Sequence, residues 1–301
     1  MYLMKNKFKP IFPLSLPATA AMIISEKEIR RAAYSFIGAV LRDFFMPQFL
    51  RSTGISSREI VSVDHPLDKK IPFRPEAVKT YLSFIEFWVG PLVHLYRVGG
   101  KKTVAGIVLF LEDLTRFYKG AGDIYRTVHS TTVRPRYVKN MRFAMIHLLD
   151  PHFNCVPSLH VIIAAYSYHK ISRLAALCGD VLCATKIQQE LEDKACAIVE
   201  SVLFIKQHSV NCVASGLFFL SSHYAEYTDD DAFRFISKLF RSAESALPDG
   251  EEIRRNITDL FCEFKTEYAL CGDCRYVLST FLAHYRSFRQ IPQGESVSAE
   301  A

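Results

Sequence analysis

Two histidines, each preceded at short range by a serine, are the side chains best suited to chemistry. The first stands in the run Pro157, Ser158, Leu159, His160. Proline suits the first turn of a helix, so this run predicts the opening of one. Free main-chain N–H groups at such an opening, with the positive end of the helix dipole, favour an anion. A helix-opening Pro-Ser followed by a buried core histidine is the simpler alternative, and the residues alone leave both open.

The second histidine, His208, follows Ser201 and Lys206. Two residues rotate by about 200° in a regular helix, so Lys206 and His208 cannot share a helical face. The spacing therefore predicts that a helix begins near His208, with Lys206 on the turn that enters it, where both could meet one anion. Arg134 is preceded by Arg126 in a hydroxyl-rich loop. A guanidinium there could grip a phosphate in a bidentate fork.

Helices must position these side chains, because helical periodicity dominates the chain. Apolar residues recur every three or four positions from about Glu26 onward, at Ile29, Ala33, Phe36, Val40 and Phe44. Three prolines predict an extended connection over 64–75. Further helices are expected over 76–97, 102–118, from near Pro157, over 186–200, from near His208, around Phe233, over 249–269 and over 275–288. We expect no strand, and the predicted fold class is all-α.

The chain is expected to fall into three parts. Residues 1–60 form an N-terminal leader and helix, 61–226 the helical domain that carries the chemistry, and 227–301 a helical C-terminal extension. The leader has lysines followed by a short apolar run and resembles a signal peptide in outline. Pro13 and Pro17 interrupt that run, so a disordered or docking leader is the alternative.

Composition limits the class of protein. Of 301 residues, 50% are hydrophobic and 23% charged, which excludes a disordered chain. The net charge of +6 suits an anionic substrate or an anionic membrane surface. No basic block suggests nucleic acid, so none is predicted as a partner. The eight cysteines are expected to be reduced thiols. Cys271 and Cys274 have metal or redox spacing but stand without a second pair, so no metal is predicted.

Membrane insertion is weighed from apolar stretches. The stretches 10–25, 151–169 and 207–225 lack charged residues, but prolines or polar residues interrupt each. None predicts the roughly 20-residue apolar span that a bilayer requires. A soluble or peripheral helical protein is therefore favoured over a multi-span one. Glu86 and Glu112 break two further apolar runs, and we expect them either to pack in a soluble core or to be buried between helices.

Together these segments resemble the type 2 phosphatidic acid phosphatase superfamily, which also contains vanadium haloperoxidases and inositol phosphorylceramide synthases. Pro157, Ser158 and His160 match the family's second motif, and Ser201 and His208 have the spacing of its third. The lysine two residues before the second histidine is similar to the inositol phosphorylceramide synthase variant. The resemblance covers roughly residues 64–224.

The chain departs from the family pattern at three positions. Cys212 stands where the family has Asp, and Val202 stands where many members have Arg. The family's first motif is Lys, six residues, Arg-Pro. With Arg134 as its Arg, the Lys position is occupied by Thr127, and Arg126 lies one residue too early to take that place.

The resemblance implies a helical bundle of the phosphatase and haloperoxidase type with additional C-terminal helices. It implies hydrolysis or transfer of a phosphoryl group from a lipid phosphate or another phosphate monoester, without metal or cofactor. His208 would attack phosphorus to form a phosphohistidine, and His160 would protonate the leaving oxygen. The expected phosphate-binding residues are Arg134, Lys206, Ser158, Ser201 and Arg126. Vanadate-dependent peroxidase chemistry is disfavoured by the lysine pattern.

Cys212 determines whether activity is expected. Four residues beyond His208, position 212 is expected on the same helix face, where the family's Asp would orient the imidazole. With a thiol there, the alternative is a catalytically impaired member that binds lipid or phosphate or serves as a scaffold. Activity would require either a Cys212 thiolate stabilised by Arg134 and Lys206, or another carboxylate such as Asp150 that reaches the imidazole. The expected location is a membrane or its surface, with a soluble cytoplasmic protein as the alternative.

Overall fold

A computed structural model describes residues 13–135, 137, 141–176 and 181–285 of the chain. Helices dominate it, which confirms the all-α class. The α-helices are α1 (Leu16–Ser25), α2 (Lys27–Ala39), α3 (Met46–Ser52), α4 (Val78–Leu82), α5 (Phe84–Gly99), α6 (Val104–Tyr125), α7 (Met141–Leu149), α8 (Leu159–Ala176), α9 (Val181–Phe204), α10 (Val210–His223), α11 (Asp229–Lys238), α12 (Gly250–Cys271) and α13 (Cys274–Ala283).

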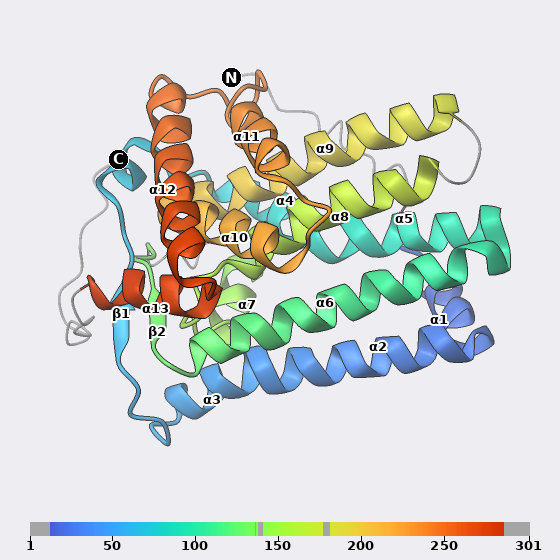
Figure 1. Cartoon of the computed structure of the whole chain (residues 1–301), viewed down its shortest axis with the longest axis horizontal. Helices are drawn as coiled ribbons and strands as arrows, with labels where there is room; N and C mark the ends of the chain where they lie inside the picture. The colour runs from blue at the N-terminus through green and yellow to red at the C-terminus, as the bar shows by residue number, and fades with distance from the viewer. Residues whose placement is uncertain (1–12, 136, 138–140, 177–180, 286–301) are drawn as a thin grey trace.

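Long helices run side by side in the bundle, and the C-terminal helices pack across one end of it (Figure 1). Within the bundle α8 packs on α9 and on α5, and α2 packs on α6. At the end, α12 packs on α10, and α13 packs on both α12 and α6. One hydrophobic cluster extends from Met22 in α1 to Leu282 in α13. The C-terminal helices therefore share the core of the bundle.

Helix α10 lies at the centre of this core. Its residues from Val210 to Leu220 are all buried. A helix that is apolar on every side must be enclosed by other elements, and here α8, α12, α11 and α13 surround it. The buried helices expected from near Pro157 and near His208 are thus confirmed as α8 and α10.

The N-terminal helix predicted from about Glu26 is confirmed as α2, with Ile29 and Ala33 buried. It continues without a break through one π-helical segment, Val40–Phe45, into α3. Residues 1–12 of the expected leader lie outside the described residues, and the end of its apolar run forms α1.

Several helix bounds differ from the predicted ones. The helix expected over 76–97 is divided at Ser83 into α4 and α5. The next helix, α6, continues to Tyr125 rather than ending near 118. The connection over 64–75 is extended in part but contains the 3₁₀ turns Pro66–Lys70 and Pro75–Ala77. Proline fits the first position of each turn, because its missing N–H is not needed there.

The expectation that there are no strands is wrong at two short segments. Strand β1 (Ile60–Ser62) pairs in parallel with β2 (His129–Thr131), and Ser130 also bridges to Asn154. Three residues are too few to show an alternating pattern, so nothing in the sequence marks them. The small sheet connects the segment after α3 to the loop that precedes α8, and so helps to fix that loop.

Glu86 and Glu112, which interrupt the two apolar runs, differ in their exposure to solvent. Glu112 is exposed, whereas Glu86 is half-buried and accepts a hydrogen bond from the Leu14 N–H at 3.3 Å. Asp113, next to Glu112, is buried and accepts a hydrogen bond from the Tyr166 hydroxyl at 2.6 Å. No helix in the described part of the chain combines the length and the apolar character needed to cross a bilayer.

Candidate functional site

The two motif histidines meet in the structure. Ser158 and His160 stand at the opening of α8, and His208 stands just before α10. The Ser158 Oγ lies 3.2 Å from the His208 Nε2, and the rings of His160 and His208 have centroids 5.6 Å apart. The structure therefore brings these three side chains, distant in sequence, to one place.

The turn between α9 and α10 positions His208. Lys206 has a positive φ of 59°, and the N–H groups of Gln207 and His208 both donate to the carbonyl of Val202, at 2.9 and 3.1 Å. A left-handed residue just after a helix, with such backward hydrogen bonds, is a common way to end a helix. The Ser209 hydroxyl then accepts from the Asn211 N–H and caps α10. The prediction that a helix begins near His208 is confirmed.

Because His208 precedes α10, it does not share a helical face with Cys212. The expectation that they lie on one face is wrong, since the spacing of four residues applies only within a helix. Cys212 is fully buried. Burial and a hydrogen bond with Cys212 raise the pKa of Cys155 well above its ordinary value. The thiol of Cys212 is thus turned toward Cys155.

A small cavity of about 10 Å³ lies beside the histidines, which is about the room that one water molecule needs. Its walls come from the segments around α3, α8 and the turn before α10. The lining residues are Phe44, Gln48, Asp150, His152, Asn154, Cys155, Leu159, His160 and His208. A phosphate group is larger than a water molecule, so lining side chains must move to admit one.

His152 and Asp150 join this site although the sequence reasoning did not choose His152 at all. The His152 ring centroid is 6.2 Å from that of His208, and its Nε2 lies 2.8 Å from the Thr132 hydroxyl. The Asp150 Oδ1 accepts from the His152 N–H at 2.9 Å, a turn typical of an aspartate followed by proline. His152 has a φ of 68°, a region in which histidine is enriched among non-glycine residues. The Asp-Pro-His turn is the sequence signal that could have indicated it.

Arg134 lies at the edge of the site, half-buried. Its Nη1 donates to the Gln207 Oε1 at 3.2 Å and to the Asp150 carbonyl oxygen at 3.4 Å. Burial lowers the pKa of Arg134, while Asp150 acts in the opposite direction. An arginine remains charged at neutral pH even with such a shift. Arg134 is therefore a cation hydrogen-bonded to Gln207, the residue that precedes His208 in the chain.

Burial controls the protonation of the histidines. Burial lowers the pKa of His160 to about 4. Burial and the neighbouring His160 lower the pKa of His208 well below its ordinary value, and the Cys155 carbonyl acts in the opposite direction. Both rings are thus neutral at neutral pH. A neutral imidazole has a lone pair for attack, whereas acid catalysis needs a proton, which a bound phosphate dianion would favour by raising the pKa of both rings.

The orienting partner that the family places on the second histidine is missing within the described residues. The His208 Nδ1 is buried and makes no hydrogen bond of standard geometry to any of them, although the Cys155 carbonyl is close enough to the ring to raise its pKa. Asp150 lines the cavity, but its side chain accepts a hydrogen bond from the His152 N–H. Asp150 therefore comes near the imidazole without orienting it.

None of the five residues expected to bind phosphate lines the cavity, and three of them bind other partners. The Lys206 amine donates to the carbonyl oxygens of Asp68, at 2.6 Å, and Ile71. The Ser201 hydroxyl donates to the Ile198 carbonyl at 2.7 Å, within α9. For these two, the partners are main-chain carbonyls and not a ligand in the cavity.

Arg126, the third, ends α6 and pairs with two carboxylates. It contacts Asp43 and also Asp123, the latter at 2.7 Å. Two carboxylates neutralise it, which leaves little attraction for a phosphate. Arg134 is therefore the cation that the structure leaves close to the histidines.

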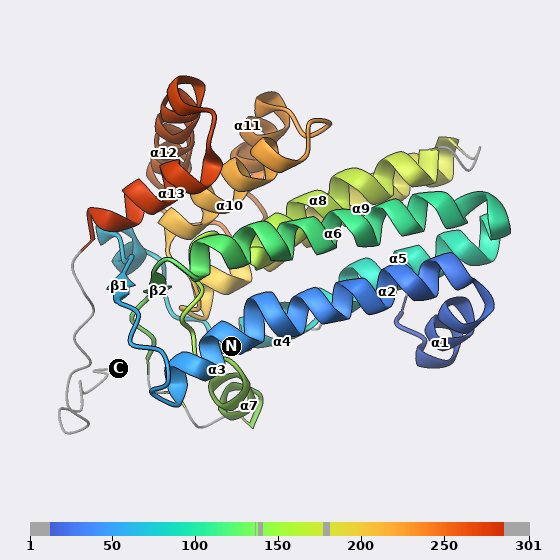
Figure 2. The same ribbon diagram turned by 60° about the horizontal axis from the view of Figure 1, so that its bottom comes forward.

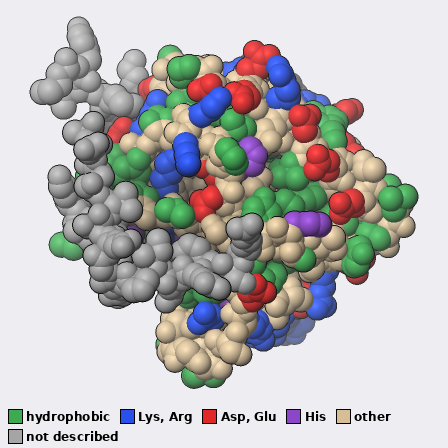
Figure 3. Space-filling model, turned by 90° about the vertical axis from the view of Figure 1, so that its left-hand side faces the viewer, with side chains coloured by type: hydrophobic (Ala, Val, Ile, Leu, Met, Phe, Trp, Pro, Cys, Tyr) green, Lys and Arg blue, Asp and Glu red, His purple; other side chains and the backbone are tan. Residues whose placement is uncertain are grey.

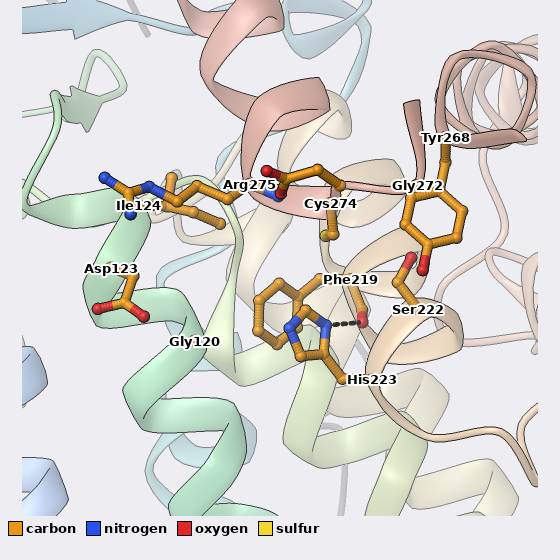
Figure 4. A pocket seen from close by; sticks show the side chains of 11 residues that line it. Gly120, Asp123, Ile124, Phe219, Ser222, His223, Tyr268, Gly272, Cys274 and Arg275 are labelled. Carbon is orange, nitrogen blue, oxygen red and sulfur yellow. Dashed lines mark hydrogen bonds between the residues drawn. The ribbon is translucent and has the colours of Figure 1, made fainter. Parts of the chain in front are cut away.

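A second and larger pocket, of about 260 Å³, lies between α6, α10, α12 and α13 (Figure 4). The ring of His223 stacks on Phe219 with centroids 3.9 Å apart, and its Nδ1 lies 2.9 Å from the Phe219 carbonyl oxygen. Ser222, Tyr268 and Arg275 line the same pocket. It holds one histidine and none of the motif residues, so it does not reproduce the paired chemistry of the smaller site.

Neither a search of the described residues for metal-binding clusters nor comparison with known proteins identifies a further site or a family. In the described ranges no three His, Cys, Asp or Glu side chains are grouped to hold a metal ion. A scan against protein-family models, a search of curated proteins and a search of solved structures each find no match to the chain.

Proposed function

We propose that this chain is a phosphoesterase or phosphotransferase of the type 2 phosphatidic acid phosphatase kind, acting on a lipid phosphate or another phosphate monoester through a phosphohistidine at His208. The observation that carries the proposal is that His160 and His208 line one small cavity, with the Ser158 hydroxyl 3.2 Å from the His208 Nε2. Two neutral imidazoles and a hydroxyl, with Arg134 nearby, form a set that phosphoryl transfer through histidine can use.

The first step places the nucleophile at Nε2 of His208. In this mechanism the Ser158 hydroxyl, 3.2 Å from this atom, donates to its lone pair, which requires the ring proton to be on Nδ1. An arriving phosphate oxygen would accept the hydrogen bond of the Ser158 hydroxyl in place of His208, which would leave the Nε2 lone pair free for attack. The Nε2–P bond then forms as the bond between phosphorus and the ester oxygen breaks, and His160 gives its proton to the leaving oxygen.

The second step reverses the roles. Water, or an acceptor alcohol in a transferase, gives a proton to His160 and attacks phosphorus. The P–N bond breaks, and the electron pair returns to Nε2 of His208. In both steps Arg134 would turn from Gln207 to the phosphate oxygens, where its charge opposes the charge that accumulates.

A second candidate function is phosphate binding without turnover. It is favoured by the His208 Nδ1, to which no described carboxylate is hydrogen-bonded. In a serine protease, loss of the orienting carboxylate lowers the turnover number by about 10⁴, which is about 5 kcal/mol in the barrier. A comparable loss here would leave an anion site with little catalysis.

Turnover of p-nitrophenyl phosphate and of phosphatidic acid in detergent micelles tests the proposal. The wild-type chain should release phosphate, His208→Ala should abolish release, and His160→Ala should reduce it by a factor of about 10² or more. His223→Ala, in the larger pocket, is the matched histidine control and should keep the wild-type rate. An acid-labile phosphoenzyme should form in the wild type and be absent from His208→Ala.

The alternatives give other results. Calorimetric binding of inorganic phosphate without turnover, lost in Arg134→Ala, would establish the binding function instead. A folded wild-type chain that neither binds phosphate nor hydrolyses either substrate would refute both functions.

A further inference from the structure

The continuous helix from α2 to α3 exposes a row of large apolar side chains. Tyr34, Ile37, Leu41, Phe45 and Phe49 are between 41% and 67% exposed. They recur every three or four residues, so they follow one side of the helix. Single exposed apolar residues are ordinary, but a contiguous row of them marks an interaction surface. We call these five residues the apolar stripe.

The backbone keeps the apolar stripe straight. Helices α2 and α3 form one rod along an outer edge of the bundle (Figures 1 and 2). The π-helical segment Val40–Phe45 lies in the middle of the rod. Its wider turn holds Leu41, Phe45 and Phe49 in line at intervals of four residues. The other side of the rod, including Ile29, Ala33 and Ala39, is buried against the bundle.

Positive charges outnumber negative ones along the rod that carries the apolar stripe. Over residues 27–52 the basic residues are Lys27, Arg30, Arg31, Arg42 and Arg51, and the acidic ones are Glu28 and Asp43. Asp43 is buried and paired with Arg42 and Arg126, which leaves Glu28, at the start of α2, as the exposed acidic residue in that range. By contrast, acidic and basic side chains are interspersed on the face shown in Figure 3.

We propose that the apolar stripe docks the protein onto the surface of a bilayer that contains anionic lipids. An interfacial helix has aromatic and aliphatic side chains on one side and basic side chains beside them, and this rod has both. Basic residues at the headgroups attract anionic lipids, while the stripe enters the boundary with the acyl chains. The rod would lie parallel to the membrane, with its buried side still packed in the bundle.

A second copy of this chain fits the surface less well. In a two-fold dimer the same patch faces itself, so the arginines of one copy would meet those of the other. Asp43 could not compensate, because it is buried and already paired. An anionic bilayer supplies the opposite charge that the surface lacks.

The docking surface is next to the candidate site but does not depend on its chemistry. Phe44 and Gln48, on the adjoining side of the same helix, line the cavity beside His208. A helix with its side chains is about 10 Å across, so docking would hold the cavity at about that distance from the membrane interface. Binding to vesicles can therefore be measured whether or not the protein hydrolyses phosphate.

Vesicle flotation tests the docking surface with the whole 301-residue chain. The wild type should float with vesicles of phosphatidylcholine and phosphatidylserine, and less with phosphatidylcholine alone or at high salt. Phe45→Ser and Phe49→Ser should each weaken partitioning by about tenfold, because each removes one large apolar group from the interface. Arg31→Ser should weaken it by about fivefold, and only for anionic vesicles.

Leu270→Ser is the matched control, because Leu270 is 86% exposed but lies on α12, away from the rod. It should float as the wild type does. All variants should keep the wild-type circular dichroism spectrum, since surface substitutions cost little stability.

Three results would overturn the docking proposal. One is a wild type that stays with the soluble fraction in the presence of anionic vesicles. Another is flotation of Phe45→Ser and Phe49→Ser equal to that of the wild type. The third is a wild-type dimer in light scattering that these variants dissociate, which would assign the apolar stripe to a second copy.

The rate on p-nitrophenyl phosphate without vesicles separates this proposal from the proposed function. The apolar-stripe variants should keep the wild-type rate. Flotation without hydrolysis would refute the phosphoesterase and leave docking intact, and hydrolysis without flotation would do the reverse.

Discussion

Replacement of Cys212 by aspartate would put a carboxyl group into the most enclosed helix of the bundle. Cys212 is fully buried in α10, beside Cys155. The family pattern would suggest that Cys212→Asp restores an orienting carboxylate. The structure predicts instead that the variant is destabilised, because position 212 does not share a helical face with His208.

The size of the effect follows from the cost of an ionised carboxylate in a dry site. Full burial raises an Asp pKa by about 3 to 5 pH units above its ordinary value of about 3.9. At pH 7 the folded protein would hold the acid protonated while the unfolded chain ionises it. The gap of about three pH units, at about 1.4 kcal/mol each, costs about 4 kcal/mol. At pH 5 the same cost is about 1.5 kcal/mol, because the deficit grows only as the pH rises above the unfolded pKa.

Urea unfolding at pH 7 and pH 5, followed by circular dichroism, measures this difference. Cys212→Asp should lose about 4 kcal/mol of unfolding free energy at pH 7, a large part of the 5 to 15 kcal/mol typical of a folded protein. Cys212→Ser is the control, because its hydroxyl does not ionise and its loss should be equal at both pH values. Equal stability of Cys212→Asp at the two pH values would refute the reasoning, since the carboxylate would then be ionised and paired. A simultaneous rise in phosphatase activity would identify His208 as its partner.

Three further substitutions test the packing and protonation of the site. Ser158→Ala should cost about 1 to 3 kcal/mol in urea unfolding, because it leaves the buried His208 Nε2 without its 3.2 Å partner; an unchanged midpoint would show that water replaces the hydroxyl. Gly216→Ala should cost about 1 to 3 kcal/mol, because its methyl group would lie 2.9 Å from the Val161 Cβ and 3.2 Å from the Ser158 carbonyl oxygen; a thermal melt equal to that of the wild type would contradict the close approach. Burial lowers the pKa of His160 to about 4, so the wild type should lose up to about 3 kcal/mol between pH 6.5 and pH 4. His208 and His152 are buried too and add their own losses, so His160→Asn should reduce the loss by about that amount, and a wild-type pH dependence in this variant would assign the loss to other groups.

The parts of the fold that the sequence predicts well depend on local signals. Proline and serine before an apolar run give the start of α8, and the incompatible faces of Lys206 and His208 give the start of α10. The period of the apolar residues gives α2. Each of these signals lies within one element, so the tertiary structure does not need to be known.

The directions of the site side chains could not be predicted in the same way. The amine of Lys206 binds carbonyl oxygens near residues 68–71, which are distant in sequence. Cys212 turns to Cys155 in the loop before α8, and Asp150 turns to the backbone of His152. Which of several candidates reaches a partner depends on how distant elements pack, and spacing along one helix does not contain that information.

The π-helical segment Val40–Phe45 makes the length of the first helical rod a constraint in its own right. A π turn holds one residue more than an α turn, so removal of one residue there would let an α turn form, whereas removal of one residue from α2 would turn the remainder of the rod by about 100°. Phe44 and Gln48 would then leave the cavity, and Phe45 and Phe49 would rotate out of their exposed row. Point substitutions can alter the exposed row alone, whereas a single deletion in α2 would disrupt the row and the cavity wall together. The residue types on the two sides of the rod can therefore change independently, but both sides depend on the same helical register.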